Sequence, residues 1–171
     1  MSKKLVLLIV FLTSSCGWLF GSDEFYLCPM VSIPRESSYL IQKYDNIDSF
    51  RIEITGFDGF CFYDDRTKSN RAAVTPIFKI TRLRPSDEAD IHFSYFIETA
   101  EGPVEFLGKQ TFHTKVTLPT DSQYLHFKAR QTQVRLPLEE NAKIDIRMGL
   151  VMSRSEKNYN KTIFDIDYKY E

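Results

Sequence analysis

Strict alternation of apolar and polar residues over short stretches is the feature that most constrains how this chain can fold. It is clearest in residues 142–152, where apolar side chains occupy every second position. A period of two places those side chains on one face of an extended strand, so that this face packs inward and the other meets water. Further strands are predicted at residues 30–33, 50–57, 74–83, 90–99, 109–118 and 163–170.

Segments of this kind recur at intervals of roughly a dozen residues, which is typical of all-β domains. The 14 Phe and 9 Tyr residues are strand formers. Residues 153–161 are expected to form no more than a polar turn of helix, and no stretch shows a convincing amphipathic helical period. We therefore predict an all-β fold, an antiparallel immunoglobulin-like β-sandwich, with a small soluble β-barrel as the alternative.

The Asp58-Gly59 pair predicts a two-residue hairpin, because a type I′ turn needs positive φ at both central residues. Such a turn places Cys61 on the same face as Ile52 and Ile54, the expected core side. The opposite face then carries three aromatic side chains, Phe57, Phe60 and Phe62. An exposed cluster of that size is a candidate contact patch. Two alternatives stay open: another part of the chain covers the cluster, or a β-bulge shifts the alternation.

The first sixteen residues have the layout of a secretory signal that ends in a cysteine. Lys3 and Lys4 precede an apolar run over residues 5–12, and the small residues 13–15 lead to Cys16. In bacterial lipoproteins, a cysteine at this position is acylated and becomes the first residue of the mature chain. The sequence thus predicts a signal peptide over residues 1–15, a lipidated Cys16 with a tether over residues 16–27, and a single domain over residues 28–171.

Two other interpretations of the leader stay open. An uncleaved spanning helix needs about 20 apolar residues, and this run is shorter. Cleavage near Ser15 would release a soluble protein, but it leaves Cys16 without a role. Thr13 departs from the aliphatic residue that usually stands three positions before a lipidated cysteine. Gly17, where an aspartate would retain a lipoprotein at the inner membrane, favours the periplasmic side of the outer membrane.

The remaining cysteines and the charge balance fit an exported protein. Cys28 and Cys61 form an even pair in a compartment where disulfides persist, so we expect them to be bonded; two free buried thiols are the alternative. Without Lys3 and Lys4, the 22 basic residues fall to 20 against 23 acidic ones, a net charge near −3. Nucleic-acid binding depends on a basic excess that neutralises phosphates, so this class of partner is excluded.

No residue pattern in the chain supports catalysis. His92 and His113 fall on the polar sides of their strands, and they could share a surface metal site only if those strands pair in register. Neither these two residues nor His126 has the close ligand spacing of a metal site. Nucleophile elbows and phosphate-binding glycine loops are absent from the sequence. We expect no enzyme activity, no cofactor and no metal.

Several short motifs resemble a set of alphaproteobacterial envelope lipoproteins. The likeness spans about residues 28–161 and rests on Cys28-Pro29, Gly59 with Cys61-Phe62-Tyr63, Gly108-Lys109-Gln110 with Phe112, and Tyr159-Asn160-Lys161. The resemblance implies a lipidated cysteine at the start of the mature chain and two further cysteines like Cys28 and Cys61. It implies no activity. The chain departs from the family pattern at the bulky Phe60 and over residues 162–171.

The sequence therefore leads to two expectations about function. The first is a non-catalytic binding or structural module, held in the cell envelope by acyl chains and engaging a membrane and an envelope protein. The second is a carrier or enzyme that acts on an envelope lipid or glycan through a pocket between the sheets. A contiguous apolar cavity would favour the second, and a filled core with a bare edge strand or exposed aromatic patch would favour the first.

Overall fold

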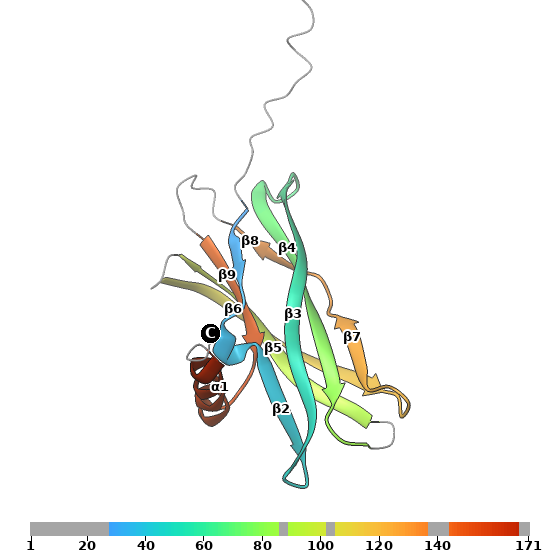
Figure 1. Ribbon diagram of the computed structural model, residues 1–171. Helices are drawn as coiled ribbons and strands as arrows, with labels where there is room; N and C mark the ends of the chain where they lie inside the picture. The colour runs from blue at the N-terminus through green and yellow to red at the C-terminus, as the bar shows by residue number, and fades with distance from the viewer. Residues whose placement is uncertain (1–27, 86–88, 102–104, 137–143, 168–171) are drawn as a thin grey trace, which may run out of the picture.

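Two β-sheets face each other across a shared core in the computed structural model, which describes residues 28–85, 89–101, 105–136 and 144–167 (Figure 1). The predicted all-β sandwich is therefore confirmed. The predicted signal peptide, Cys16 and its tether lie outside these ranges. Within the described part, no helix has the length and apolar character needed to cross a bilayer.

The first sheet has the strand order β1-β9-β5-β6. Its members are β1 (Met30–Ser32), β5 (Ala89–Glu101), β6 (Glu105–Leu118) and β9 (Ile144–Leu150). β5 and β6 form a long antiparallel hairpin, and β9 pairs with the second half of β5. β1 pairs in parallel with β9 at the edge of the sheet, where its flanking prolines cost no ladder hydrogen bond.

The second sheet is built around two long strands. Its members are β2 (Tyr39–Tyr44), β3 (Ile47–Asp64), β4 (Ser69–Arg82), β7 (Tyr124–Lys128) and β8 (Thr132–Arg135). β3 lies between β2 and β4, while β7 and β8 pair with successive parts of the other edge of β4. A short 3-10 turn, η2 (Arg35–Ser37), leads from β1 to β2.

Large apolar side chains from both sheets fill the space between them. Phe78 of β4 lies against Phe93 and Tyr95 of β5, with ring centroids 5.0 and 5.2 Å apart, and Tyr95 stacks on Phe112 of β6 at 5.0 Å. Around these rings lie side chains with no exposed surface: Ile52, Ile80, Ile91, Leu118, Ile146, Met148 and Leu150. Burial of these groups is the main source of the stability of the sandwich.

The predicted hairpin at Asp58-Gly59 is wrong. β3 continues through both residues, which pair with Thr75 and Val74 in the middle of the β3–β4 ladder. The two-residue turn lies instead between β2 and β3, where Asp45 and Asn46 have φ of 52° and 62° and their neighbours Tyr44 and Ile47 pair. Asn tolerates the left-handed conformation that a type I′ turn requires, so this pair satisfies the same rule.

A β-bulge in β3 decides which side chains face the core. Ile54 pairs with Phe78 and Gly56 pairs with Ile77, so Thr55 is an extra residue in the ladder. Before the bulge, the even-numbered residues point inward; after it, the odd-numbered ones do. Cys61 therefore does share the core face with Ile52 and Ile54, as predicted, although the hairpin from which this was deduced does not exist.

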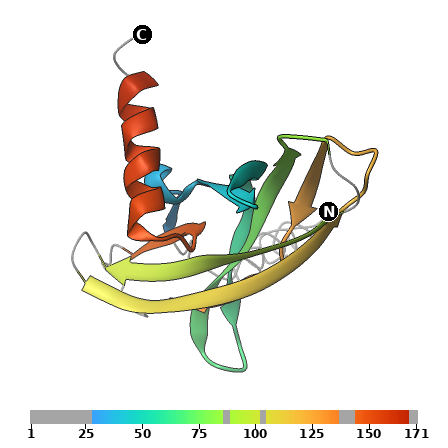
Figure 2. The same cartoon turned by 90° about the horizontal axis from the view of Figure 1, so that it is seen from below.

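The strand predicted for residues 163–170 is also wrong over the described part, because α1 (Arg154–Asp167) is a helix. A capping box begins it: the backbone N–H of Ser153 donates to Glu156 Oε2 at 2.7 Å, and the N–H of Glu156 donates to Ser153 Oγ at 3.3 Å. α1 lies beside η2, on the opposite side of the molecule from β7 (Figure 2).

One buried amide fixes α1 to the sandwich. The side chain of Asn160 is 2% exposed, and its Nδ2 donates to the carbonyls of Glu36 at 3.1 Å and Tyr39 at 2.8 Å. Both acceptors belong to the segment that contains η2 and the start of β2. These bonds satisfy backbone groups that would otherwise be buried without partners, so they hold the helix in one place.

Candidate functional site

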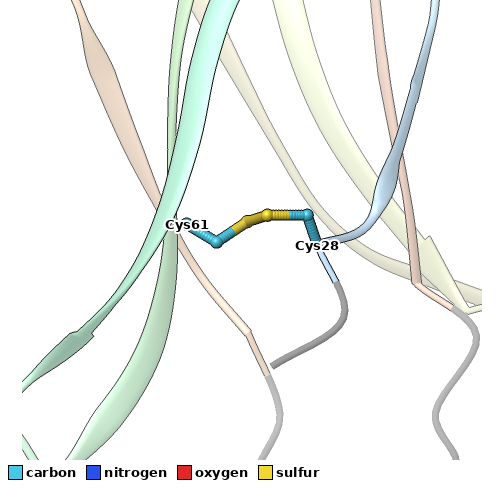
Figure 3. The surroundings of a disulfide bond; sticks show 2 residues. All are labelled: Cys28 and Cys61. Atoms are coloured by element: carbon cyan, nitrogen blue, oxygen red, sulfur yellow. A yellow bond between two sulfur atoms is a disulfide. The ribbon is translucent and has the colours of Figure 1, made fainter. Parts of the chain in front are cut away.

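The Cys28–Cys61 disulfide joins the two sheets at the end of the molecule where β1 begins (Figure 3). The two Cα atoms lie 5.7 Å apart, and the bond closes a separation of 33 residues. Cys28 lies just before β1 of the first sheet, whereas Cys61 belongs to β3 of the second. The expected disulfide is therefore confirmed, and Cys16 remains as the one other cysteine of the chain.

The three phenylalanines of the candidate contact patch do not share one face. After the bulge, Phe60 and Phe62 point outward, with ring centroids 5.7 Å apart, and Phe60 is 59% exposed. Phe57 takes the inward alternation, and its ring lies over Gly59, whose added Cβ would meet it at 3.6 Å. Phe57 is nevertheless 38% exposed. The structure thus brings together two of the three residues.

Arginines lie beside this aromatic pair on the outer face of the second sheet. Arg71 of β4 pairs with Phe62 of β3, and Arg135 of β8 pairs with Arg71. We call this surface the Phe60–Phe62 face and define it by Phe60, Phe62, Arg71 and Arg135. No local sequence pattern indicates that these arginines meet the aromatic pair, because they come from segments far apart in the chain.

Asp64 orders the turn at the end of β3, next to this face. Its carboxylate accepts hydrogen bonds from the N–H of Arg66 at 3.0 Å and from Thr67 Oγ1 at 2.9 Å, and Arg71 Nε lies 2.9 Å away. The hydrogen bond from Thr67 is the main cause that lowers the pKa of Asp64, with the Arg71 charge adding to it. The Asp64 carboxylate therefore stays charged at neutral pH.

The same part of β3 has a bare edge. β2 covers β3 only as far as Glu53, and on that side no strand pairs with residues 55–64 in the part of the chain that the structure describes. A bare edge exposes backbone donors and acceptors to which an extended segment could add. Exposed aromatic side chains and an open edge therefore meet at the disulfide end of β3.

The histidines lie elsewhere and form no metal site. β5 and β6 do pair in register, which places His92 opposite Lys115 and Ser94 opposite His113 on one outer face. Ser94 Oγ and His113 Nδ1 are 2.8 Å apart at a shallow hollow of about 300 Å³. His126 belongs to the other sheet, where its ring meets Tyr124 edge-on. Among the described residues, no group of three or more His, Cys, Asp or Glu side chains could hold a metal ion.

A larger hollow of about 650 Å³ lies on the outer face of β2 and β3, beside α1. Tyr39 and Ile41 of β2, the Arg51–Glu53 ion pair of β3 and Tyr159 of α1 contribute to its lining, and the ion pair measures 3.2 Å. The sequence did not indicate this groove, because the predicted strand at 163–170 left no helix to form its wall. Like the histidine hollow, it opens on an outer face of the sandwich.

Three kinds of known protein data were compared with the chain: family models, curated proteins and solved structures. No protein-family model, curated protein or solved structure matches the chain. Support for a function therefore comes from the chemistry of its own residues.

Proposed function

We propose that the protein is a lipid-anchored lipoprotein of the bacterial cell envelope, in which the β-sandwich is a non-catalytic binding or structural module facing the periplasm. The observation that carries the proposal is the use of the three cysteines. Cys28 and Cys61 are bonded to each other, which leaves Cys16 alone at the end of a leader with a positive start and an apolar run. A disulfide of this kind persists in an oxidising compartment such as the periplasm.

The surface described above supports a binding role over catalysis. The core is filled by large side chains of both sheets, and the two hollows lie on outer faces rather than between the sheets. A carrier or enzyme of the alternative class needs an enclosed pocket with convergent polar groups. An open strand edge beside exposed aromatic rings is instead the kind of surface that sandwiches offer to partners.

The proposal is tested by detergent phase partitioning of the protein expressed in a bacterium that processes lipoproteins. The wild type should enter the detergent phase, because several acyl chains hold a protein durably in an apolar phase. Cys16→Ala should remain in the aqueous phase or accumulate with its leader uncleaved, whereas Ser14→Ala, which keeps a small residue in the leader, should behave as the wild type. A wild type that stays in the aqueous phase, or equal partitioning of the wild type and of Cys16→Ala from which the leader has been removed, would overturn the proposal.

A further inference from the structure

We infer that the Phe60–Phe62 face rests on the surface of the membrane that anchors the protein, with its two rings at the level of the headgroups and its arginines against anionic lipids. This inference rests on the proposed lipid anchor and names what the contact surface meets. Four observations carry it: the place of the disulfide, the exposure of Phe60, the charge beside the two rings and the end of the molecule on which they lie.

The disulfide ties this face to the anchored end of the chain. Cys16 precedes Cys28 by twelve residues, and a chain of twelve residues spans at most about 40 Å when fully extended. Cys28 is bonded to Cys61, which lies between Phe60 and Phe62 in β3. Cys61, between the two aromatic residues, therefore lies no farther from Cys16 than this span plus the 5.7 Å that separates the Cα atoms of Cys28 and Cys61.

The two rings are suited to a membrane interface. Phe60 and Phe62 point outward from the same face of β3, 5.7 Å apart, and Phe60 keeps 59% of its surface exposed. Contiguous exposed apolar surface with a polar rim is typical of an interaction site. Protein segments that lie in the membrane interface bury Phe, Trp and Leu side chains at the boundary between headgroups and acyl chains, so a bilayer surface can cover this pair.

The charges around the rings complement an anionic surface. The end of β3, the turn that follows it and the adjacent ends of β4 and β8 carry two carboxylates, Asp64 and Asp65, and four cations: Arg66, Lys68, Arg71 and Arg135. Asp64 pairs with Arg71 at 2.9 Å, and Asp65 with Lys68 at 3.8 Å. None of the ion pairs found among the described residues involves Arg66 or Arg135. Two exposed arginines are therefore available for lipid phosphates, which attract juxtamembrane cations.

The shape of the molecule agrees with this orientation. β1 begins and β3 ends at the same end of the sandwich, whereas the β2–β3 turn lies at the other end and α1 stands to the side (Figure 1). The exposed Tyr159 of α1, at 60%, therefore lies away from the anchored end and provides a matched control for Phe60.

The test places a single tryptophan on each surface of the full lipidated protein. Trp18 is the chain's one tryptophan and is replaced by Phe; Phe60→Trp or Tyr159→Trp is then added. Each protein is reconstituted into vesicles of phosphatidylcholine and phosphatidylglycerol, with or without brominated phosphatidylcholine as a quencher. We expect the emission of the Phe60→Trp variant to be blue-shifted and quenched several-fold more than that of the Tyr159→Trp variant. Phe62→Trp is a second reporter if Phe60→Trp folds poorly.

The outcomes distinguish failure of the proposed lipid anchor from failure of the proposed membrane contact by the Phe60–Phe62 face. Equal quenching of the two reporters in protein that carries acyl chains and floats with the vesicles would overturn the membrane face and leave the anchor standing. A blue shift at Phe60→Trp that grows with protein concentration, without quenching by bromolipid, would overturn it in favour of contact between copies. Protein without acyl chains that fails to float would overturn both. Arg135→Glu should reduce quenching of the Phe60→Trp variant in phosphatidylglycerol vesicles but not in pure phosphatidylcholine.

Discussion

Gly149 is a residue at which a single methyl group should disturb both the sandwich and the helix attached to it. It lies in β9 opposite Phe96 of β5, and an added Cβ would come within 2.7 and 2.8 Å of the Phe96 ring and closer still to Ser37 Oγ. We expect Gly149→Ala to lower the free energy of unfolding by about 1–3 kcal/mol through overpacking. Urea unfolding of the wild type and of Gly149→Ala measures this difference in the free energy of unfolding.

Gly56 provides the matched control for that substitution. It lies beside the bulge in β3, and an added Cβ would have no neighbour within 4 Å. Gly56→Ala should therefore leave the free energy of unfolding unchanged within about 0.5 kcal/mol. Equal losses in the two variants would show that the close approach at Gly149 has no energetic consequence.

Asn160 gives a second prediction at the scale of one residue. Asn160→Ala removes two donors from the carbonyls of Glu36 and Tyr39, so we expect a loss of about 2–4 kcal/mol in unfolding free energy. Asn158→Ala, at an exposed position of the same helix, should cost less than about 0.5 kcal/mol. If both variants unfold at the same urea concentration, α1 is not held in place by the Asn160 amide.

At the scale of elements, the disulfide should contribute more than any one hydrogen bond. It closes a separation of 33 residues between the start of β1 and β3. Replacement of both cysteines, Cys28→Ser with Cys61→Ser, should lower the unfolding free energy by about 2–4 kcal/mol, because the unfolded chain gains freedom. Reductant should lower the melting temperature of the wild type and leave that of the double variant unchanged. A wild type whose melting temperature does not change with reductant would contradict this prediction.

The elements show which parts of the fold could be predicted from the sequence and which could not. Alternation located most of the long strands, including β5 and β9, because the period of two depends only on neighbouring residues. The turn was misplaced because Asp58-Gly59 carries a strong local signal that long-range pairing with β4 overrides. The helix was predicted too short, as a single polar turn over residues 153–161, because residues 163–170 alternate as a strand would. Ser153 and Glu156 have the spacing of a capping box, which is the signal for a longer helix.

The candidate site was predictable only in part, for a related reason. The pairing of Cys28 with Cys61 followed from counting the cysteines of a chain that we expect to be exported. The face of the sheet on which the Phe57 side chain lies depends on one bulged residue, Thr55. A shift of one residue in the alternation moves every later side chain to the opposite face. Arg71 and Arg135 join the aromatic pair through strand pairing between distant segments, which no local pattern encodes.

At the scale of the whole molecule, the disulfide links the end of the domain that follows the proposed anchor to a defined surface. It holds the beginning of the domain against β3, so the proposed lipid, the aromatic pair and the bare strand edge all belong to one end of the sandwich. The groove beside α1 and the histidine hollow lie on other surfaces. A protein built in this way would present one end to a membrane and its remaining faces to the periplasm.

The intact mass of the mature protein, purified from a bacterium that processes lipoproteins, tests this account most directly. We predict a chain that begins at Cys16, carries the added mass of acyl groups and gains the mass of two hydrogens on reduction, as one disulfide requires. A chain that keeps Met1, or one that begins near Cys16 without acyl mass, would contradict the account.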